Sequence, residues 1–532
     1  MRRWNGWGDQ TIDYPLPPSA ADYLETRIGP GDPKLDATLE SVLSTVPDSR
    51  LPPHPLIQTD PLERLCHARG QSLPDWVALR SGRIEGFPDG VSYPTNDLEV
   101  RSLLEDAKKM DFRVIPYGGG SSVVGHLTPP ADGPPVLSMD LGQLNKLIEL
   151  DPTNQLATFD AGACGPDLEA QLRPHGYLLG HYPQSFEYST LGGWIATRST
   201  GQQSYYYGRI EALFAGGHVE TPIGPLDLPP FPASAAGPDV RQLILGSEGR
   251  LGVITRAILR VRPIPERESF QAIFFRDWES GAAAVRAIAQ AGVGVSMLRL
   301  SDAQETETTL ALSGKERLVS LADPGLRLLG FGPQRCLLIF GVTGSRHATT
   351  EALRMTTSIA RGHRGLHVGA TIGKIWHKSR FRTPYLRNTL WEQGYALDTV
   401  ETAVPWRSVL PLAEALRAAA SEGLASSGER VLGFVHLSHM YRSGASIYLT
   451  FLYRRAADPE ETLQRWRTLK AAASQAIVSH GGTISHQHGV GIDHLPYLKS
   501  EKGEVGLEAL EGARRLLDPK GLMNPGKLLE GS

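Results

Sequence analysis

The sequence predicts an α+β protein built from two domains, and three observations support this fold class. A strand–helix–strand pattern over residues 91–116 leads into a loop with three consecutive glycines. Two more loops rich in glycine and hydroxyl side chains follow before Pro265. After Pro265, strands and helices alternate in the way that is typical of an antiparallel sheet covered by helices. A length of 532 residues fits two or three domains.

The first half of the chain begins with an irregular, partly helical arm over residues 1–60, followed by a helical pattern over 62–79. Asn96 and Glu99 predict a capping box at the start of a helix, and Leu103 and Ala107 lie on its apolar face. The remaining elements of this half are a helix over 166–175 and strands over 91–94, 113–116, 136–140, 147–151 and 156–161, with a further strand ending at Val261.

In the second half the expected helices cover 278–291, 348–361, 375–393 with a break at Pro384, 409–422 and 459–479. The expected strands cover 296–300, 336–342, 431–436 and 444–453, and residues 508–529 form a helix and tail. We therefore divide the chain into an N-terminal arm over 1–85, a first domain over 86–265, a second domain over 266–500 and a tail over 501–532.

The composition is that of an ordinary globular protein, with 41% hydrophobic and 21% charged residues. The net charge of −3 gives no reason to expect nucleic acid as a partner. Three separated cysteines (Cys66, Cys164 and Cys336) predict no disulfide framework and favour a reducing compartment. No secretory signal and no apolar run of the length that a membrane span needs is present, so we expect a cytoplasmic protein.

The chemically most informative stretch is PYGGGSSVVG at residues 116–125. Glycines let backbone N–H groups approach a ligand closely, and successive N–H groups can converge on phosphate oxygens. The stretch has neither the Gly-Lys-Ser/Thr ending nor the G-x-G-x-x-G pattern of the common nucleotide sites, and a tight surface turn is the alternative. A long loop at 180–208 and the LGSEGRLGVIT segment at 245–255 accompany it, and loops of this length are usually functional.

A resemblance to a known family rests on four segments in order: PYGGGSSVVG, PQSFEYSTLGGWIATRSTG, LGSEGRLGVIT and the terminal LDPKGLMNPGK. They closely resemble the FAD-binding fold of the vanillyl-alcohol oxidase superfamily. RRWNGWGD, SMLRLSD, PYLRNTL, ETAVPW, GASIYLTF and GGTISHQHGVG further resemble the alkyldihydroxyacetonephosphate synthases. The resemblance implies a two-subdomain, FAD-binding PCMH-type fold over 86–265, an antiparallel-sheet substrate (cap) domain over 266–500, and a C-terminal tail that returns to the FAD domain.

The same resemblance implies FAD bound without a covalent link. It places the pyrophosphate on the first segment, the isoalloxazine and ribityl region on the second and the adenosine side on the third. The implied cofactor-binding residues are Pro116, Tyr117, Gly118, Gly119, Gly120, Ser121, Ser122, Gln184, Ser185, Phe186, Glu187, Tyr188, Ser189, Thr190, Thr197, Arg198, Ser199, Thr200, Gly246, Ser247, Glu248, Gly249, Arg250, Leu251 and Gly252.

The resemblance also assigns catalytic side chains. Tyr448 matches the catalytic tyrosine of the family, and without the resemblance it would be interpreted as a strand tyrosine packed on the sheet. His486 and His488 match the outer two of three consecutive histidines, whereas the middle position is Gln487, which cannot move protons by titrating.

Three further residues are candidate substrate contacts. Arg387 matches the substrate-phosphate arginine, although a guanidinium suits phosphate and carboxylate equally. Arg299 is a second candidate anion contact that Asp302 or another acid could instead neutralise. His436 lies where animal-type synthases carry an arginine. Because positions three apart face opposite sides of a strand, we do not expect His436 and His439 to share a metal.

The leading hypothesis is an enzyme of ether-lipid synthesis that exchanges the acyl chain of acyl-dihydroxyacetone phosphate for a long-chain alcohol, without net redox change. Its partners would be lipid-like small molecules, with room for peripheral membrane contact and a homodimer. The alternative is a FAD-linked dehydrogenase or oxidase of a D-2-hydroxy acid. In the metal-dependent members, histidines and a glutamate stand where this chain has Tyr441, Tyr448 and Gln487, which counts against that alternative. A non-catalytic flavin-binding protein is the third hypothesis.

Overall fold

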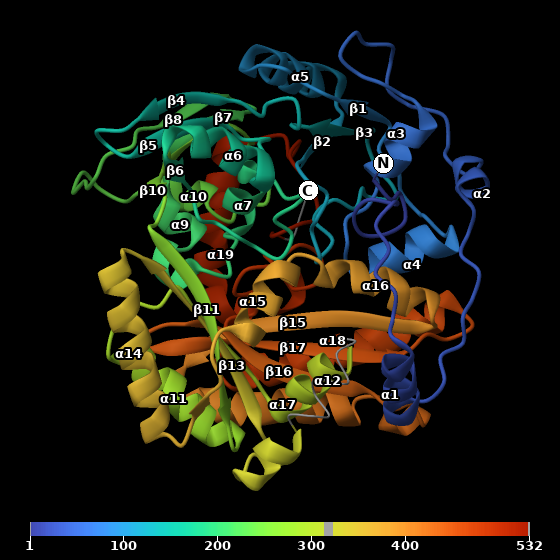
Figure 1. Cartoon of the computed structure of the whole chain (residues 1–532). Coiled ribbons are helices and arrows are strands. Elements are labelled where there is room, and N and C mark those ends of the chain that lie inside the picture. Colours follow the sequence, from blue (N-terminus) through green and yellow to red (C-terminus); the bar gives the residue numbers. More distant parts are fainter. Residues whose placement is uncertain (1, 313–322, 530–532) are drawn as a thin grey trace.

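The computed structural model describes residues 2–312 and 323–529. Figure 1 shows two sheet-containing halves, one above the other, with the N-terminal arm running down one side of both. The upper half holds the strands of residues 90–263, and the lower half holds those of residues 267–454. The mixed α+β class predicted from the sequence is confirmed.

Two sheets form the upper half. A parallel sheet has the order β1-β3-β2, and an antiparallel sheet has the order β4-β5-β9-β7-β8. The strands are β1 (Gly90–Ser92), β2 (Arg113–Tyr117), β3 (Val136–Asp140), β4 (Leu147–Asp151), β5 (Leu156–Asp160), β7 (Phe214–Thr221), β8 (Gly224–Leu228) and β9 (Val253–Arg260), with the separate pair β6 (Tyr177–Leu178) and β10 (Arg262–Pro263). The helices of this half are α5 (Asp97–Met110), α6 (Gly165–Leu172), α7 (Leu191–Thr197), α8 (Ser204–Tyr207), α9 (Ile210–Leu213) and α10 (Arg241–Ile244).

One seven-stranded sheet organises the lower half, in the order β14-β11-β13-β12-β16-β17-β15. Every pair of neighbouring strands in it is antiparallel, as the alternation after Pro265 predicted. The strands are β11 (Arg267–Phe275), β12 (Met297–Ser301), β13 (Cys336–Gly344), β14 (Leu366–His367), β15 (Tyr395–Pro405), β16 (Leu432–Met440) and β17 (Gly444–Arg454).

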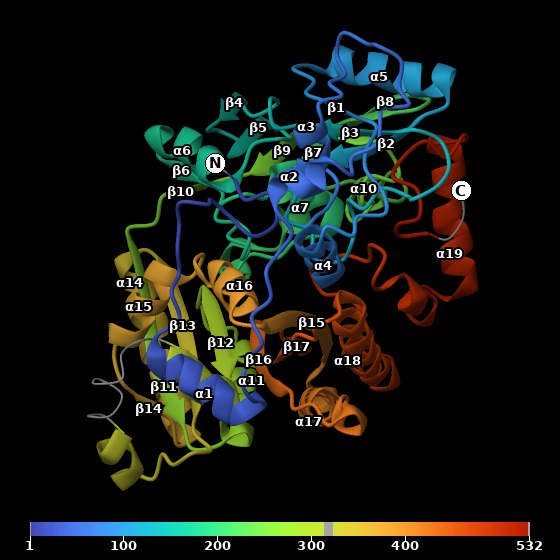
Figure 2. The same ribbon diagram turned by 90° about the vertical axis from the view of Figure 1, so that its right-hand side faces the viewer.

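Helices cover both faces of this sheet (Figure 2). One face buries the largest apolar cluster, beneath α11 (Trp278–Gln290), α14 (Arg346–Gly362), α17 (Trp406–Glu422) and α18 (Pro459–Ser479). The opposite face carries α1 (Pro18–Ile28), α12 (Ala303–Leu312), α15 (Thr371–Ser379) and α16 (Thr383–Glu392). Strand positions alternate between the faces, so Val435 packs under the helices of the first face, while Phe434 lies on the second.

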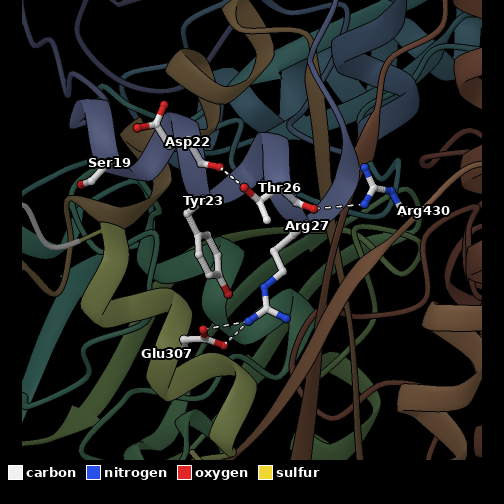
Figure 3. A pocket seen from close by; sticks show the side chains of 7 residues that line it. All are labelled: Ser19, Asp22, Tyr23, Thr26, Arg27, Glu307 and Arg430. Carbon is white, nitrogen blue, oxygen red and sulfur yellow. Dashed lines mark hydrogen bonds and ion pairs between the residues drawn. The ribbon is translucent and has the colours of Figure 1, made fainter. Parts of the chain in front are cut away.

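The N-terminal arm is fixed to the lower half through α1. Leu24 and Ile28 are buried against Leu390 and the sheet. Around a shallow pocket beside α1, Arg27 donates to both carboxylate oxygens of Glu307 at 2.7 Å (Figure 3). Exposed ion pairs of this kind contribute about 0–1 kcal/mol, so the buried apolar contacts dominate the attachment.

Two helices of the first half differ from the sequence prediction, and one of them differs because of the loop at 116–125. The expected helix over 62–79 is two helices, α3 (Pro61–Cys66) and α4 (Leu73–Ser81). Between them the chain meets the glycine loop, where the N–H of Gln71 donates to the carbonyl of Ser122 at 2.6 Å. At the start of α5 the Asn96 side chain accepts the Glu99 N–H, but the Glu99 carboxylate accepts from Thr95 rather than Asn96, so the capping box is not reciprocal.

The C-terminal segment returns to the upper half. The last long helix, α19, spans Leu498–Leu517 and begins ten residues before the predicted one. Beyond it, Val114 of β2 donates to the Leu522 carbonyl at 2.9 Å and accepts from the Asn524 N–H at the same distance.

The N-terminal arm contains one more short helix, α2 (Leu39–Leu43). Within the described residues, no helix is long and apolar enough to cross a bilayer.

Candidate active site

A cavity of about 1110 Å³ lies between the two halves and reaches residues of both. It is larger than the roughly 300–1,000 Å³ of common ligand pockets, as a site for a dinucleotide and a second molecule requires. All seven residues of 116–122 line it. The segment that the sequence marked by its glycines is therefore one wall of the cavity.

The glycines of this wall are needed because the backbone packs tightly on the next segment. A Cβ added at Gly119 would lie 1.8 Å from the carbonyl oxygen of Tyr188, and one at Gly118 would lie 2.2 Å from Thr190 Oγ1. The Arg2 guanidinium donates to the Gly119 carbonyl from outside and lies over the Tyr188 ring. The loop is therefore held by contacts with both Arg2 and residues 188–190.

The other two predicted cofactor segments reach the cavity only in part. Its lining includes Gln184, Ser185, Ser189, Thr190, Thr197, Ser199, Thr200, Glu248, Gly249 and Gly252. Eight predicted residues do not line this cavity, and their contact with FAD stays a prediction: Phe186, Glu187, Tyr188, Arg198, Gly246, Ser247, Arg250 and Leu251.

Packing explains where these eight residues go. The Phe186 ring stacks on Phe381 at 4.9 Å, and the hydroxyl of Tyr188 bonds that of Tyr385 at 2.9 Å. Arg250 donates to the Met523 carbonyl at 2.7 Å and is fully buried. These side chains pack against other protein groups and so support the cavity wall. A sequence motif alone cannot distinguish this supporting role from direct contact with the ligand.

Tyr448 lies on β17, where a strand was expected, and lines the cavity. Its hydroxyl donates to Thr399 Oγ1 at 3.1 Å. The His436 ring stacks on it at 4.9 Å, and the His488 ring meets it edge-on at 5.7 Å. Burial raises the pKa of Tyr448 above its ordinary value, so the phenol stays protonated at neutral pH.

Arg299 and His436 share a carboxylate that the sequence analysis missed. Arg299 Nη2 lies 2.7 Å from Glu305 Oε1, and His436 Nδ1 lies 3.0 Å from the same oxygen. Burial alone would raise the pKa of Glu305, but the charge of Arg299 and the His436 contact hold it below its ordinary value. Asp302, the partner considered from the sequence, instead accepts the Val435 and Glu305 N–H groups. Only a helix prediction extending to residue 305 would have placed Glu305 beside Arg299.

Arg387 is a half-buried cation whose guanidinium is only partly used in hydrogen bonds to the described residues. Its Nη1 donates to the Gln71 carbonyl at 2.5 Å, and its guanidinium lies 4.3 Å above the Trp76 ring. Nε and Nη2 are buried without a hydrogen-bond partner among the residues that the structure describes. Burial lowers the pKa of Arg387 to about 10, which leaves it charged at neutral pH. A cation with two buried, unused donors suits an anionic ligand.

Residues 485–491, the histidine loop, face Tyr448 across the cavity edge. His488 and Gln487 line the cavity, and burial lowers the pKa of His488, so it is neutral at pH 7. His486 does not line it. Its Nε2 meets the Tyr441 hydroxyl at 2.6 Å, and its ring stacks on His439 at 5.0 Å. His486 therefore contacts Tyr441 and His439 instead of lining the cavity, and its catalytic role stays a prediction.

His436 and His439 both line the cavity, contrary to the expectation that they face opposite sides of a strand. The register between β16 and β17 shifts between Leu437 and Met440, and this irregularity turns His439 to the same side. Even so, no group of three His, Cys, Asp or Glu side chains in the described ranges is placed to hold a metal ion.

Aromatic residues of the N-terminal arm also line the cavity and were not predicted as site residues. Trp7, Tyr14 and Trp76 contribute, and Asn388 next to Arg387 donates to the Trp7 carbonyl at 2.9 Å. A signal for Trp7 was present in the sequence, because it belongs to the RRWNGWGD motif. That motif supported the family resemblance, but none of its residues was assigned to the site.

Comparisons with known proteins define the class of this site. A family model described as FAD binding domain matches residues 88–226, and one described as FAD linked oxidases, C-terminal domain, matches residues 264–528. The chain is therefore a flavoprotein enzyme of the FAD-linked oxidase class, and FAD is its cofactor. The cradle at Gly118 and Gly119 fits such a ligand, as does the buried Thr200 hydroxyl on the cavity wall, which has no hydrogen-bond partner within residues 2–312 and 323–529.

Within that class the similarity is specific. Alkyldihydroxyacetonephosphate synthase of Dictyostelium discoideum is 30% identical, covering 89% of this chain and 78% of the relative. The enzyme of the same name from Trypanosoma brucei brucei is 28% identical, covering 99% and 92%. A solved alkyldihydroxyacetonephosphate synthase structure superposes with a TM-score of 0.86 at 27% identity, covering 99% of both chains. The chain belongs to the alkyldihydroxyacetonephosphate synthase family.

Proposed function

We propose that this protein exchanges the acyl chain of acyl-dihydroxyacetone phosphate for a long-chain alcohol and so forms the ether bond of an ether lipid. One observation carries the proposal: flavin segments, the unneutralised Arg387 and an apolar branch all open into a single cavity. The apolar branch consists of Phe274, Met297, Leu326, Leu337, Ile339, Ile372 and Trp376, which form one cluster. A phosphate ester with a long chain needs all three features.

The roles of the side chains follow from their positions. Arg387 would bind the phosphate through Nε and Nη2. FAD, when bound, supplies an electron sink for the reaction. The fatty acid departs with the electron pair of its bond to C1, and the incoming alcohol must lose a proton. His488, held neutral by burial, is placed to accept that proton, and Tyr448 beside it is placed to donate one to the departing carboxylate.

The Arg299–Glu305–His436 cluster would shape the part of the site next to Tyr448. Because Glu305 Oε1 contacts both Arg299 and His436, neither of these side chains is as free as Arg387 to bind an anion. We therefore assign the phosphate to Arg387. Arg299 and His436 would contact the uncharged part of the substrate near C1.

The oxidoreductase alternative is disfavoured by the same site. Tyr441, Tyr448 and Gln487 occupy the positions where metal-dependent hydroxy-acid enzymes need ligands. A small hydroxy acid also has no use for the apolar branch.

The direct test is product formation. Purified protein loaded with FAD is incubated with acyl-dihydroxyacetone phosphate and radiolabelled hexadecanol, and we expect label in an alkali-stable phospholipid with release of one fatty acid per ether formed. Labelled ether absent at saturating substrate, with a hydroxy acid oxidised instead, would overturn the proposal. Arg387→Gln serves as a binding-defective control.

A long-chain substrate resides in bilayers, so we expect peripheral membrane contact by a cytoplasmic protein. Flotation with phosphatidylcholine vesicles containing hexadecanol tests this, and protein that stays entirely in the dense fraction contradicts it. We also expect a homodimer, which sedimentation equilibrium measures.

A further inference from the structure

Two buried carboxylates hold the histidine loop, one from each half of the molecule. Glu401 lies on β15 of the lower sheet, and Glu248 lies in the third flavin segment of the upper half. Glu401 is fully buried, and Glu248 is 5% exposed. Burying two charges costs several kcal/mol each unless hydrogen bonds satisfy them, so their partners indicate what they do.

Glu401 binds the part of the loop that carries the site residues. Its Oε1 accepts the N–H groups of His486 at 2.9 Å, Gln487 at 2.8 Å and His488 at 3.0 Å. The Ser485 hydroxyl donates to the same oxygen at 3.0 Å. Three consecutive N–H groups converge on one oxygen, so the carboxylate fixes the backbone that aims His488.

Glu401 is also fixed relative to Tyr448. The two residues are paired directly across β15 and β17. The carboxylate therefore fixes the position of His488 relative to the strand that carries Tyr448. The rings of His488 and Tyr448 meet at 5.7 Å.

Glu248 binds the other end of the loop. Its Oε1 accepts the Val490 N–H at 2.5 Å, and its Oε2 accepts the Gly491 N–H at 2.9 Å. His126 Nε2 lies 3.1 Å from Oε2, and His126 Nδ1 lies 2.8 Å from the hydroxyl of Ser122. A chain of contacts thus runs from the glycine loop of the flavin site to the histidine loop.

One glycine of the loop, Gly489, is explained by these contacts. A Cβ at Gly489 would lie 2.8 Å from His126 and 2.9 Å from the Glu248 carboxylate, and Gly489 has a φ of +85°. Its conformation and the absence of a side chain both serve the close approach of Glu248. The sequence HGVG therefore encodes the docking of the loop onto a carboxylate.

We propose that Glu401 and Glu248 form a two-domain carboxylate clamp in which Glu401 is the positioning residue for His488 and Glu248 ties the loop to the flavin segment. The contribution of the clamp to catalysis rests on the proposed function. Its effect on the loop does not, because the clamp acts on backbone N–H groups that can be observed directly.

Amide hydrogen exchange with single-residue resolution tests the clamp. In the unmodified protein, residues 486–488 should exchange as slowly as β15, although they lie in a loop and donate to no backbone carbonyl in the described residues. Glu401→Gln should speed exchange at 486–488 at least tenfold and leave 490 and 491 unchanged. Glu248→Gln should give the reverse pattern.

Glu220→Gln is the matched control, because Glu220 is equally buried but pairs with Arg101 and His218 away from the loop. It should change neither group of amides. Fast exchange at 486–488 in the unmodified protein, or an equal effect of both variants on both ends of the loop, would overturn the clamp. The first of these measurements needs no variant and so stands even where a substitution prevents folding.

Kinetics separate the clamp from the proposed function. With FAD content unchanged, Glu401→Gln should lower kcat for alkyl exchange at least tenfold while KM changes less than twofold, since Glu401 does not line the cavity. An inactive unmodified protein would refute the proposed function and leave the amide pattern as the test of the clamp. An active protein without the amide pattern would refute the clamp alone.

Discussion

Replacing Gly119 by alanine should remove most of the FAD from the protein. The new Cβ would lie 1.8 Å from the Tyr188 carbonyl oxygen, whereas ordinary contacts begin at 3.4 Å. The glycine loop and residue 188 must therefore separate by about 1.6 Å, which exceeds the ~0.5 Å tolerance of a preorganised site. Losing two charge-assisted hydrogen bonds to phosphate, at about 1.5–3 kcal/mol each, weakens binding by roughly 100-fold or more.

The assay for this prediction is fluorescence titration of apoprotein with FAD, together with the flavin-to-protein absorbance ratio after purification. Gly294→Ala is the control, because a Cβ there meets no atom within 4 Å. The control should bind FAD as the unmodified protein does, and denaturation should release its flavin, as expected for a non-covalent cofactor. A Gly119→Ala protein with full flavin and an affinity within threefold of normal would refute the packing argument.

Three other variants give separate readouts. Tyr448→Phe should abolish alkyl exchange and keep FAD. Loss of the hydrogen bond from Tyr448 to Thr399 should lower the stability measured by thermal unfolding by about 1 kcal/mol. Alkyl exchange at the normal rate would exclude Tyr448 from the acid–base step. Arg387→Gln should raise KM for acyl-dihydroxyacetone phosphate about 10- to 100-fold, from the loss of a charged hydrogen bond, and an unchanged KM in steady-state assays would place the phosphate elsewhere. Burial lowers the pKa of His181 to about 3. Below pH 6.5 this histidine therefore takes up a proton in the unfolded chain but stays neutral in the native protein. The free energy of unfolding thus falls as the pH falls below 6.5. The stability difference between the unmodified protein and His181→Gln should shrink by up to about 2 kcal/mol from pH 6.5 to 5, and a difference independent of pH in denaturant titrations would contradict the shift.

Local features were predictable from the sequence because their cause is local. The glycine loop follows a strand, as expected, and its glycines report close backbone contact; residues 116–122 line the cavity, and their contact with the pyrophosphate stays a prediction. Pro384 predicted a break, and α16 begins at Thr383 with this proline in its first turn, where no N–H is required. Tyr448, which only the family resemblance singled out, lies on the expected strand and lines the cavity.

Features that depend on tertiary register were not predictable. His439 faces the cavity only because the register of β16 on β17 shifts, and no local pattern marks that shift. Arg299 pairs with Glu305 rather than Asp302 because α12 begins just after β12 and turns Glu305 back onto the strand. Glu401 stood within the ETAVPW motif, but its backbone partners lie 85 residues further along the chain.

The flavin absorbance under anaerobic conditions tests the central claim most directly. FAD-loaded protein is titrated in turn with D-lactate, D-2-hydroxyglutarate, glycolate and acyl-dihydroxyacetone phosphate. We predict no change with any hydroxy acid, and a loss of the oxidised bands with acyl-dihydroxyacetone phosphate that a long-chain alcohol reverses. Lasting bleaching by a hydroxy acid would mean net reduction of the flavin, and the assignment as an alkyl transferase would be wrong.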